Sequence, residues 1–361
     1  MNSRSSLSAR LPRLRVSLPR PAASRAARTL AAVATVTGLA LTGCVAGEES
    51  TGASAVEAAD GGTLNIDFAT YNPLSLVIKD QGWLEATLED QGVEVNWVQS
   101  AGSNKANEAL RAGAIDVGST AGSAALLARS NGSPIKTISI YSQPEWAGLL
   151  VSPDSDINSV ADLAGKSVAA TKGTDPYFFL VQALEEAGLS TSDVTVENLQ
   201  HADGRTALEN GAVDAWSGLD PIMAGAEHAG AKFLYRNLDF NTYGFLNATE
   251  SFLKEKPELA QTVVNAYEKA RIWAAENPEG TAQILADVAG LDLEVARTVI
   301  LERSNLDVDA APGEAQRKVL AKVGPVFVET GDVASQTAID DAVASLLDDS
   351  FVQKADPEAI K

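Results

Sequence analysis

The chain is 361 residues long, which is enough for two domains of ordinary size. Seven arginines lie in the first 44 residues, and the remainder holds 21 basic and 48 acidic residues, a formal charge of −27 at pH 7. This acidic balance excludes nucleic acid as a partner, because phosphate backbones are bound by basic surfaces.

The first 44 residues predict export and a lipid anchor. The arginine-rich stretch is followed by an apolar run, Thr29–Leu41, which is too short to span a membrane and is typical of a signal peptide. Leu41-Thr42-Gly43-Cys44 matches the bacterial lipobox, and Cys44 is the only cysteine. We expect a signal peptide over residues 1–43 and lipid on Cys44, which anchors the exported protein to the outer face of the cytoplasmic membrane. The alternative is a chance cysteine in a cleaved signal.

Residues 44–62 are rich in Ser, Gly, Ala and Glu and lack periodicity, which is typical of a flexible tether. After them, short apolar runs alternate with amphipathic patterns, which predicts strands alternating with helices. The predicted strands of the first half are Leu64–Phe68, Val93–Val98, Ala114–Val117, Ile135–Tyr141 and Gly148–Val151. The predicted helices are Leu74–Leu88, interrupted near Gly82, a helix that opens at Ser100–Asn104 and runs to Arg111, and Ala124–Arg129.

The second half continues the alternation and ends in helices. Further strands are predicted over Ser167–Ala170, Val194–Asn198 and Lys232–Tyr235, with a long helix over Pro176–Ala187. From Ser251 onward the pattern is helical, and Leu259–Asn277 is its clearest helix, ended by Pro278.

Two sequence motifs occur twice, about a hundred residues apart. ALRAGAIDVG (109–118) matches ALENGAVDAW (207–216), and each motif predicts a helix ended by a left-handed glycine, Gly113 or Gly211, before a short buried strand that opens into a loop. Likewise, Asn72-Pro73 and Asp175-Pro176 each follow an apolar strand and suit the N-cap and first position of a helix. Either motif alone is a generic turn, but the paired order predicts two similar α/β lobes.

Two such lobes predict a shared cleft, because ligands of open α/β sheets bind beyond the carboxyl ends of the strands. The chain would cross between the lobes at Ser142–Trp146 and return at Asn241–Asn247. This places residues 63–145 in the first lobe, residues 146–241 in the second, and residues 242–361 in the return to the first lobe with the C-terminal helices.

The order of the motifs resembles a known family. The lipobox, KDQGWLE (79–85), the two Gly-Ala-x-Asp motifs, SVADLAGKSVAATKGTDPYFFLVQALEEAGL (159–189) and FLKEKPELAQTVVNAYEKARIWAAENP (252–278) follow one another as in the substrate-binding lipoproteins of ABC importers of the nitrate, sulfonate and taurine type. The aliphatic-sulfonate branch is the most similar. The resemblance implies a type II periplasmic-binding fold, with a mixed sheet flanked by helices in each lobe and two crossover segments. It also implies a monomer that delivers a small anionic or zwitterionic solute to a permease and its ATPase.

The resemblance also implies which loops hold the ligand, with no catalytic residue, metal or cofactor. The implied ligand-binding residues are Tyr71, Asn72, Ser100, Gly102, Ser103, Thr120, Gly122, Gln143, Trp146, Lys172, Gly173, Thr174, Asp175, Trp216, Asp220 and Tyr243. Two departures from the family pattern concern the ligand: Thr174-Asp175 places a carboxylate where small polar residues are usual, and Leu219 replaces an aromatic residue before Asp-Pro.

The residue types of these loops suit a small sulfonate. Ser100–Asn104 and Gly173–Pro176 are small, hydroxyl-rich and precede helices, whose free N–H groups attract oxyanions, although each is also an ordinary N-cap sequence. Trp146, Trp216, Tyr71 and Tyr243 would wall an apolar ligand body.

Three acids, Asp175, Asp220 and Glu145, lie in the same loops and suggest a zwitterion such as taurine. The alternative for Asp220 is that it holds its own loop.

Other functions remain open at this stage. Nitrate, bicarbonate or a thiamine-pyrimidine precursor are alternative solutes of the same family. An enzyme on this fold would need a reactive His, Cys or metal cluster, and neither His201 nor His228 lies in a candidate loop. A ligand sensor that signals to a membrane partner is the third hypothesis.

Overall fold

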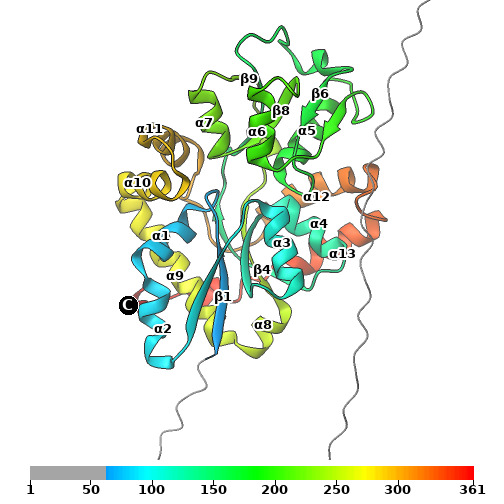
Figure 1. Ribbon diagram of the computed structural model, residues 1–361. Coiled ribbons are helices and arrows are strands. Elements are labelled where there is room, and N and C mark those ends of the chain that lie inside the picture. Colours follow the sequence, from blue (N-terminus) through cyan, green and yellow to red (C-terminus); the bar gives the residue numbers. More distant parts are fainter. Residues whose placement is uncertain (1–61) are drawn as a thin grey trace, which may run out of the picture. The chain divides into compact units, whose positions relative to one another are not determined.

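Two five-stranded sheets organise residues 62–361, the part of the chain that the computed structural model describes (Figure 1). The strand orders are β2-β1-β3-β10-β4 and β7-β6-β8-β5-β9. In each sheet the first three strands are parallel, and the fourth is antiparallel to the third. The sheets therefore share one topology, as the repeated motifs predict. The strands are β1 (Thr63–Phe68), β2 (Glu94–Gln99), β3 (Val117–Ala121), β4 (Ile135–Ser142), β5 (Ala147–Val151), β6 (Ser167–Ala169), β7 (Thr195–Glu197), β8 (Ala215–Leu219), β9 (Lys232–Tyr235) and β10 (Gly244–Thr249).

Helices flank both sheets, and we call each sheet with its helices a lobe (Figure 1). The helices are α1 (Pro73–Gln81), α2 (Trp83–Leu88), α3 (Ser103–Ala112), α4 (Gly122–Ser130), α5 (Asp175–Glu186), α6 (His201–Glu209), α7 (Ile222–His228), α8 (Glu250–Glu255), α9 (Pro257–Glu276), α10 (Pro278–Ala289), α11 (Leu293–Arg297), α12 (Glu314–Glu329) and α13 (Gln336–Leu346), with one π-helical turn, η4 (Thr298–Arg303). Single 3-10 turns are η1 (Glu89–Gln91), η2 (Val160–Leu163), η3 (Leu238–Phe240), η5 (Val352–Lys354) and η6 (Pro357–Ala359). Among residues 62–361, no helix is both long enough and apolar enough to cross a membrane.

The glycine-ended helices are confirmed. Gly113 and Gly211 have φ values of +67° and +69° and end α3 and α6, and Gly82 (φ +65°) separates α1 from α2. A left-handed residue lets the chain leave the helix while its N–H still bonds a helical carbonyl, and glycine adopts this conformation without steric cost.

Both repeated strands begin later than predicted. β3 starts at Val117, and the expected strand at Ala114–Val117 is wrong because Ala114 to Asp116 form the turn into it. β8 likewise extends to Leu219, so Ser217 lies inside a buried strand and not in a loop. The sequence predicted loops that begin at Ser119 and at Ser217, because the residues there are small or polar, but both residues lie in a strand that is covered on both faces.

One helix start also differs from the prediction. Asn72 caps α1 as predicted, because its side chain accepts a hydrogen bond from Ser75 N at 3.3 Å. At α5 the N-cap is Thr174, and Asp175 is the first helical residue. The side chain of Asp175 is thereby free to point away from its own helix.

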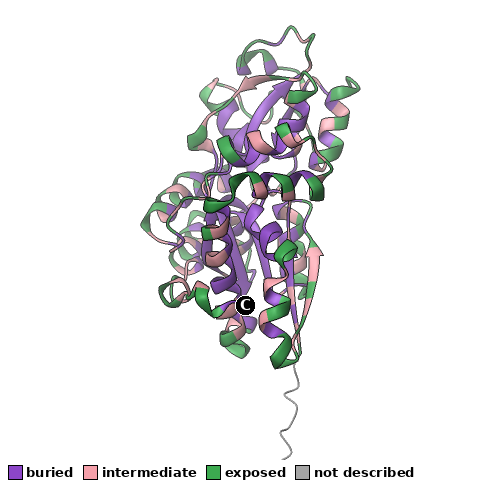
Figure 2. Ribbon diagram, turned by 90° about the vertical axis from the view of Figure 1, so that its left-hand side faces the viewer, coloured by how far each residue is buried: buried purple, intermediate pink, exposed green. Residues whose placement is uncertain are grey.

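The cores lie between the sheets and their helices (Figure 2). Leu64 and Ile66 of β1 are fully buried, and all residues of β3, β5, β8 and β10 are buried. Side chains on both faces of these strands are therefore covered. The second lobe has an additional cluster that includes Trp216 and Met223.

Two segments connect the lobes, as the sequence predicted, and a third segment runs beside them. The first crossing (residues 143–146) joins β4 to β5. The second crossing (residues 236–243) joins β9 to β10. It begins earlier than predicted because β9 ends at Tyr235, and it ends earlier because residues 244–247 belong to β10. The third segment, residues 303–310, pairs alongside β4 and the first crossing: Glu145 N donates to Arg303 O at 2.9 Å, and Ile140 N donates to Ala310 O at 2.9 Å.

The predicted lobe boundaries at residues 145 and 241 stay predictions, although the strands of the two sheets fall on either side of them. The predicted signal peptide (1–43), Cys44 and nearly all of the predicted tether lie outside the described residues.

Candidate ligand-binding site

A small cavity lies where the two lobes, the first crossing and the π-helical turn meet. Its volume is ≈ 10 Å³, room for about one water molecule. The lining residues are Thr70, Tyr71, Pro73, Ser142, Pro144, Trp146, Asp220, Val299, Arg303 and Ser304. Of the predicted site residues, the structure brings Tyr71, Trp146 and Asp220 together here.

One wall of the cavity is aromatic. The rings of Tyr71 and Trp146 meet edge to face with centroids 6.1 Å apart, and Tyr141 packs on the other side of Trp146 at 6.4 Å. Tyr71 Oη donates a hydrogen bond to Ser119 O at 2.9 Å, which fixes its ring. Tyr71 and Trp146 present an apolar surface to the cavity, and Tyr71 Oη and Trp146 Nε1 are already bonded within the protein.

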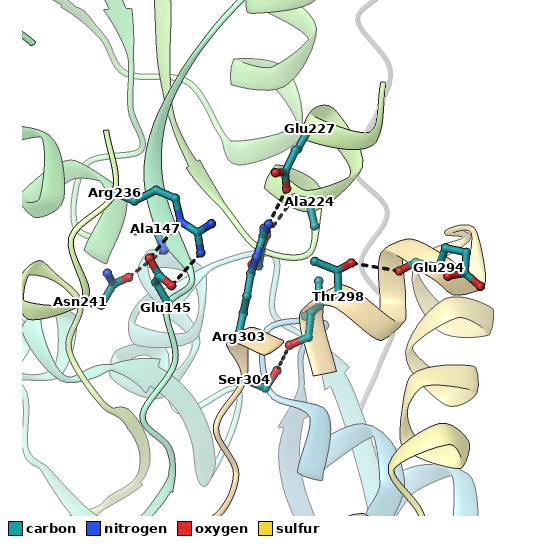
Figure 3. A network of polar contacts seen from close by, with 12 residues as sticks. Glu145, Ala147, Ala224, Glu227, Arg236, Asn241, Glu294, Thr298, Arg303 and Ser304 are labelled. Carbon is teal, nitrogen blue, oxygen red and sulfur yellow. Dashed lines mark hydrogen bonds and ion pairs between the residues drawn. The ribbon is translucent and has the colours of Figure 1, made fainter. Parts of the chain in front are cut away.

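Arg303 places a buried cation at the opposite wall. It is the one lysine or arginine that is buried within residues 62–361. Its guanidinium forms an ion pair with Asp220 at 3.4 Å and a second ion pair with Glu227 of α7 (Figure 3). The residue ends η4, and irregular π-helical turns frequently occur at functional sites. The sequence analysis missed Arg303 because an arginine in a helical pattern carries no signal of burial.

Asp220 holds its own loop and pairs with Arg303. Its Oδ1 accepts a hydrogen bond from Ala224 N at 2.8 Å, which supports the alternative that this residue organises the loop before α7. Burial raises the pKa of Asp220 to about 6, although the Arg303 charge opposes this increase. The carboxyl group therefore keeps a protonation equilibrium close to neutral pH.

Asp175 faces neither the cavity nor its own helix. Its carboxylate is buried and accepts hydrogen bonds from Ser123 Oγ, from Trp146 Nε1 at 2.8 Å, and from Thr242 N at 2.8 Å. Burial raises the pKa of Asp175 in spite of these donors. The expectation that Asp175 caps its helix or meets a ligand ammonium does not fit this placement.

Glu145 is bound to the second crossing and not to the cavity. Arg236 Nη2 and Nε donate to its two carboxylate oxygens at 2.7 and 3.0 Å (Figure 3). Beside this pair, Asn241 Oδ1 accepts a hydrogen bond from Ala147 N at 2.8 Å. The first contact ties the two crossings to each other, and the second ties the second crossing to the start of β5.

Several predicted residues bond within the first lobe. Asn72 Nδ2 donates to Tyr267 Oη at 2.9 Å, Ser103 Oγ accepts from Ala121 N at 2.9 Å, and Thr120 Oγ1 accepts from Asn247 Nδ2 at 2.8 Å. Gly122 N donates to Tyr243 O at 2.9 Å, which joins α4 to the second crossing. All five residues hold the loops behind the cavity, and none of them lines it.

Other predicted residues lie along the seam between the lobes. Ser100 is buried, and Gly102 packs on the second lobe, because a Cβ at Gly102 would lie 3.0 Å from His201 Nε2. Burial lowers the pKa of His201 to about 4. A Cβ at Gly173 would lie 3.7 Å from Asn104 of the first lobe.

Four predicted residues stand apart from the cavity. Thr174 Oγ1 donates to Thr171 O at 2.6 Å, while Lys172 is exposed and Gln143 contributes a backbone bond to the third segment. Trp216 is buried inside the second lobe, where it packs on Gly204, and it does not line the cavity.

A third buried acid, Asp67, lies close to Tyr71 of the aromatic wall, and the sequence did not point to it. Both oxygens of Asp67 accept hydrogen bonds from Ser119 N, at 2.9 and 3.0 Å. Burial raises the pKa of Asp67 to about 7, against the effect of these bonds. Asp67 is out of phase with the buried Leu64 and Ile66 in β1, so the sequence pattern gives no signal that this acid is buried.

No group of three or more His, Cys, Asp or Glu residues within residues 62–361 is placed to hold a metal ion. What the cavity offers is one guanidinium, one titratable carboxyl, two hydroxyl-bearing serines and an aromatic wall. This combination suits a small anion with an apolar body.

Comparison with known proteins agrees with this description. Residues 75–281 match the family model described as NMT1/THI5 like. A Bacillus subtilis (strain 168) protein assigned by name to aliphatic-sulfonate binding is 31% identical over 79% of this chain and 85% of the relative.

Two solved structures share the fold. The periplasmic aliphatic sulphonate binding protein SsuA from Escherichia coli is 26% identical, with a TM-score of 0.67 over 78% of this chain and 91% of that chain. The alkanesulfonate-binding protein SsuA from Xanthomonas axonopodis pv. citri bound to MOPS is 24% identical, with a TM-score of 0.71 over 78% and 97%. The two lobes thus have the type II periplasmic-binding fold, and the chain belongs to the NMT1/THI5-like family, in which it is similar to the aliphatic-sulfonate-binding proteins of ABC importers.

Proposed function

We propose that this protein is the extracytoplasmic solute-binding component of an ABC importer. It captures a small organic sulfonate between its lobes as a monomer and delivers it to a permease with its ATPase. The observation that carries this proposal is the buried guanidinium of Arg303 opposite an aromatic wall, at the junction of both lobes. The names of the similar relatives support the sulfonate.

Arg303 suits the charged end of a sulfonate. A guanidinium offers several N–H donors in one plane, and a sulfonate offers three acceptor oxygens that share one negative charge. The 3.4 Å distances from Arg303 Nη1 to the two Asp220 oxygens exceed the roughly 2.7–2.9 Å of a strong charge-assisted bond. Asp220 is therefore a weak partner that an incoming sulfonate can displace, especially when its carboxyl group is protonated.

The acids favour a plain alkanesulfonate over taurine. Asp175 and Glu145 are bonded to protein donors, which removes two of the three carboxylates that suggested a zwitterion. Tyr71, Trp146 and Pro144 instead present apolar surface for an alkyl chain.

Ligand entry requires the walls to separate. A cavity of ≈ 10 Å³ is smaller than any alkanesulfonate. Rotation of the lobes about the crossings would open the site to solvent and then close it on the ligand, as in hinged binding proteins.

Isothermal titration with butanesulfonate, taurine and nitrate tests the proposal. We expect butanesulfonate to bind most tightly, and Arg303→Met to weaken binding by about 10- to 100-fold, the value of a charge-assisted hydrogen bond. Arg129→Met is the matched control, because Arg129 forms a 2.7 Å ion pair with Glu250 away from the cavity. Tighter binding of nitrate, or equal losses in the two variants, would contradict the sulfonate assignment.

Asp220→Asn is a second variant that tests the same site without removing Arg303, so the test does not depend on the folding of Arg303→Met. It keeps an acceptor for Ala224 N and leaves the charge of Arg303 less neutralised, so affinity for butanesulfonate should be retained or increased. If Asp220 faced a ligand ammonium, the same change would weaken taurine binding selectively. Consumption of a bound sulfonate during these titrations would favour an enzyme on this fold.

We also propose export and a lipid anchor at Cys44, on the basis of the basic stretch, the apolar run and the lipobox. Cys44→Ser should release the protein from membranes or leave the signal uncleaved. Equal membrane binding of the two proteins, with an intact mass that contains no lipid, would refute the anchor.

A further inference from the structure

Donors from three separate parts of the chain hold the carboxylate of Asp175. Ser123 Oγ donates from α4 of the first lobe, and Trp146 Nε1 donates at 2.8 Å from the first crossing. The N and Oγ1 atoms of Thr242 donate at 2.8 Å each from the second crossing. Asp175 itself begins α5 of the second lobe, so one buried side chain joins both lobes and both crossings.

These donors differ in what opening would do to them. Trp146 and Thr242 belong to the crossings, which stay near the hinge axis when the lobes rotate. Ser123 belongs to the first lobe, so its bond to Asp175 must break when the lobes separate. Thr242 reinforces the closed arrangement, because its Oγ1 also accepts a hydrogen bond from Ser123 N at 3.1 Å.

Burial makes each hydrogen bond to the Asp175 carboxylate energetically important. Asp175 is only 1% exposed, and burial raises its pKa although it accepts several hydrogen bonds. A buried carboxylate that loses a donor without gaining water is strongly disfavoured. Opening therefore requires water to reach Asp175 in place of Ser123.

Asp175 is also linked to the cavity without lining it. Its bond from Trp146 Nε1 fixes the indole ring that packs edge to face against Tyr71. The lining residues of the cavity include Trp146 and Tyr71 but not Asp175.

We propose that Asp175 is a positioning residue of the hinge. Its bond from Ser123 holds the lobes together in the absence of ligand, and its bond from Trp146 sets the aromatic wall. Asp175 thereby determines ligand affinity through closure and not through contact with the ligand.

X-ray scattering of the full chain without ligand tests the hinge role. Ser123→Ala removes the hydrogen bond from the first lobe to Asp175 and should increase the radius of gyration. Ser217→Ala is the matched control, since this buried hydroxyl donates to Pro176 O at 2.6 Å inside the second lobe, and should leave the radius unchanged. Asp175→Asn keeps the side-chain size but turns an NH₂ group toward the donors, and should expand the protein at least as much as Ser123→Ala.

A radius that is the same in wild type and Ser123→Ala overturns the proposal, including the case in which the wild type is already expanded. Slower or unchanged amide exchange at residues 242–244 in Ser123→Ala would also count against it, because release of Thr242 should speed exchange there.

Affinity gives a second arm, which rests on the proposed function. Titration with butanesulfonate should show a Kd about fivefold higher for Ser123→Ala than for Ser217→Ala, the value of one ordinary hydrogen bond. A higher Kd with an unchanged radius would mean that the side chain acts on the ligand directly, and the proposal would fall. If no sulfonate binds the wild type, the proposed function fails, while scattering still decides the hinge role.

Discussion

Both lobes contain the same pair of parallel strands joined by an aspartate, and this aspartate makes the same backbone contacts in both. In the first lobe, Asp116 Oδ2 accepts a hydrogen bond from Asn65 N at 2.9 Å, and Asp116 N donates back to Asn65 O at 2.7 Å. In the second lobe, Asp214 Oδ2 accepts from Ser167 N at 2.8 Å, and Asp214 N donates to Ser167 O at 3.0 Å. The aspartate of each Gly-Ala-x-Asp motif thus fastens the start of one parallel strand to the next.

The lobes differ in how they fill the space beside this pair of strands. Gly118 of β3 stands where the second lobe has Trp216, and Ala106 of α3 stands where it has Gly204. A Cβ at Gly204 would lie only 2.7 Å from Trp216 Nε1. The second lobe therefore places a large side chain on the strand and removes one from the helix, which preserves close packing with a different distribution of volume.

They differ again in their polar groups. Asn72 caps its own helix and bonds within its lobe, whereas Asp175 at the corresponding helix start reaches across to the other lobe. Asp67 has no acidic counterpart, because the corresponding position of β6 is Ala169. The repeated residues specify the scaffold, whereas the residues that break the repeat either change the core packing, as Trp216 does, or make polar contacts of their own, as Asp175 does.

The largest expected effect concerns the tryptophan that breaks the repeat. Trp216→Ala should lower the free energy of unfolding by about 3–5 kcal/mol, because it leaves a cavity in a packed core that Gly204 cannot fill. Urea unfolding followed by circular dichroism measures this loss. At temperatures where the variant is folded, its affinity for butanesulfonate should stay within about twofold of wild type.

Gly118→Ala in the first lobe is the control for this comparison, since its new Cβ would meet side-chain atoms of Ile115 at 2.8 Å and Leu110 at 3.3 Å. If the Trp216→Ala protein had normal stability but bound sulfonate much more weakly, Trp216 would be a ligand-binding residue, as the sequence predicted.

The same contrast separates what could be predicted from what could not. Hydrophobic periodicity, helix-ending glycines and the repeated motifs predict both sheets and their topology, because these features are local or recur. Arg303, Thr242 and Ser123 could not be predicted, since each becomes important only through contacts with distant segments. The prediction that Asp175 is an N-cap was wrong for a local reason. The helix begins one residue earlier than predicted, so Thr174 is the N-cap and the side chain of Asp175 points away from its own helix.

A smaller effect is expected from Asp67, the buried acid of the first lobe whose counterpart in the second lobe is Ala169. The pKa of Asp67 is raised to about 7 in the folded protein, above the unfolded value of 3.8. Its contribution to stability is therefore complete below about pH 4 and is lost as the pH rises through 7. Between pH 5 and pH 8 this loss is on the order of 2–3 kcal/mol.

Asp67→Asn should remove that part of the pH dependence while keeping an acceptor for Ser119 N. Urea unfolding at pH 5 and pH 8 for both proteins gives the comparison as a difference of differences. Asp220 and His201 titrate in both proteins, so their contributions cancel. Parallel pH profiles for wild type and variant would show that Asp67 is not the source.

The smallest expected effect tests whether the aspartate of the Gly-Ala-x-Asp motif contributes equally to the free energy of unfolding in the two lobes. Asp116→Ala and Asp214→Ala each remove a carboxylate that accepts a backbone N–H and a side-chain donor, Asn65 Nδ2 at 3.2 Å in one lobe and Ser167 Oγ at 2.8 Å in the other. Both carboxylates are partly exposed, so each substitution should cost about 1–2 kcal/mol of unfolding free energy, with values that agree within about 0.5 kcal/mol. Asp154→Ala, at an exposed position, gives the baseline for loss of one surface charge. Equal costs above that baseline would mean that the repeat conserves an interaction as well as a shape. A cost confined to one lobe would mean that the other aspartate keeps the geometry of the motif without contributing to stability, and that the lobes depend on different contacts for the same strand order.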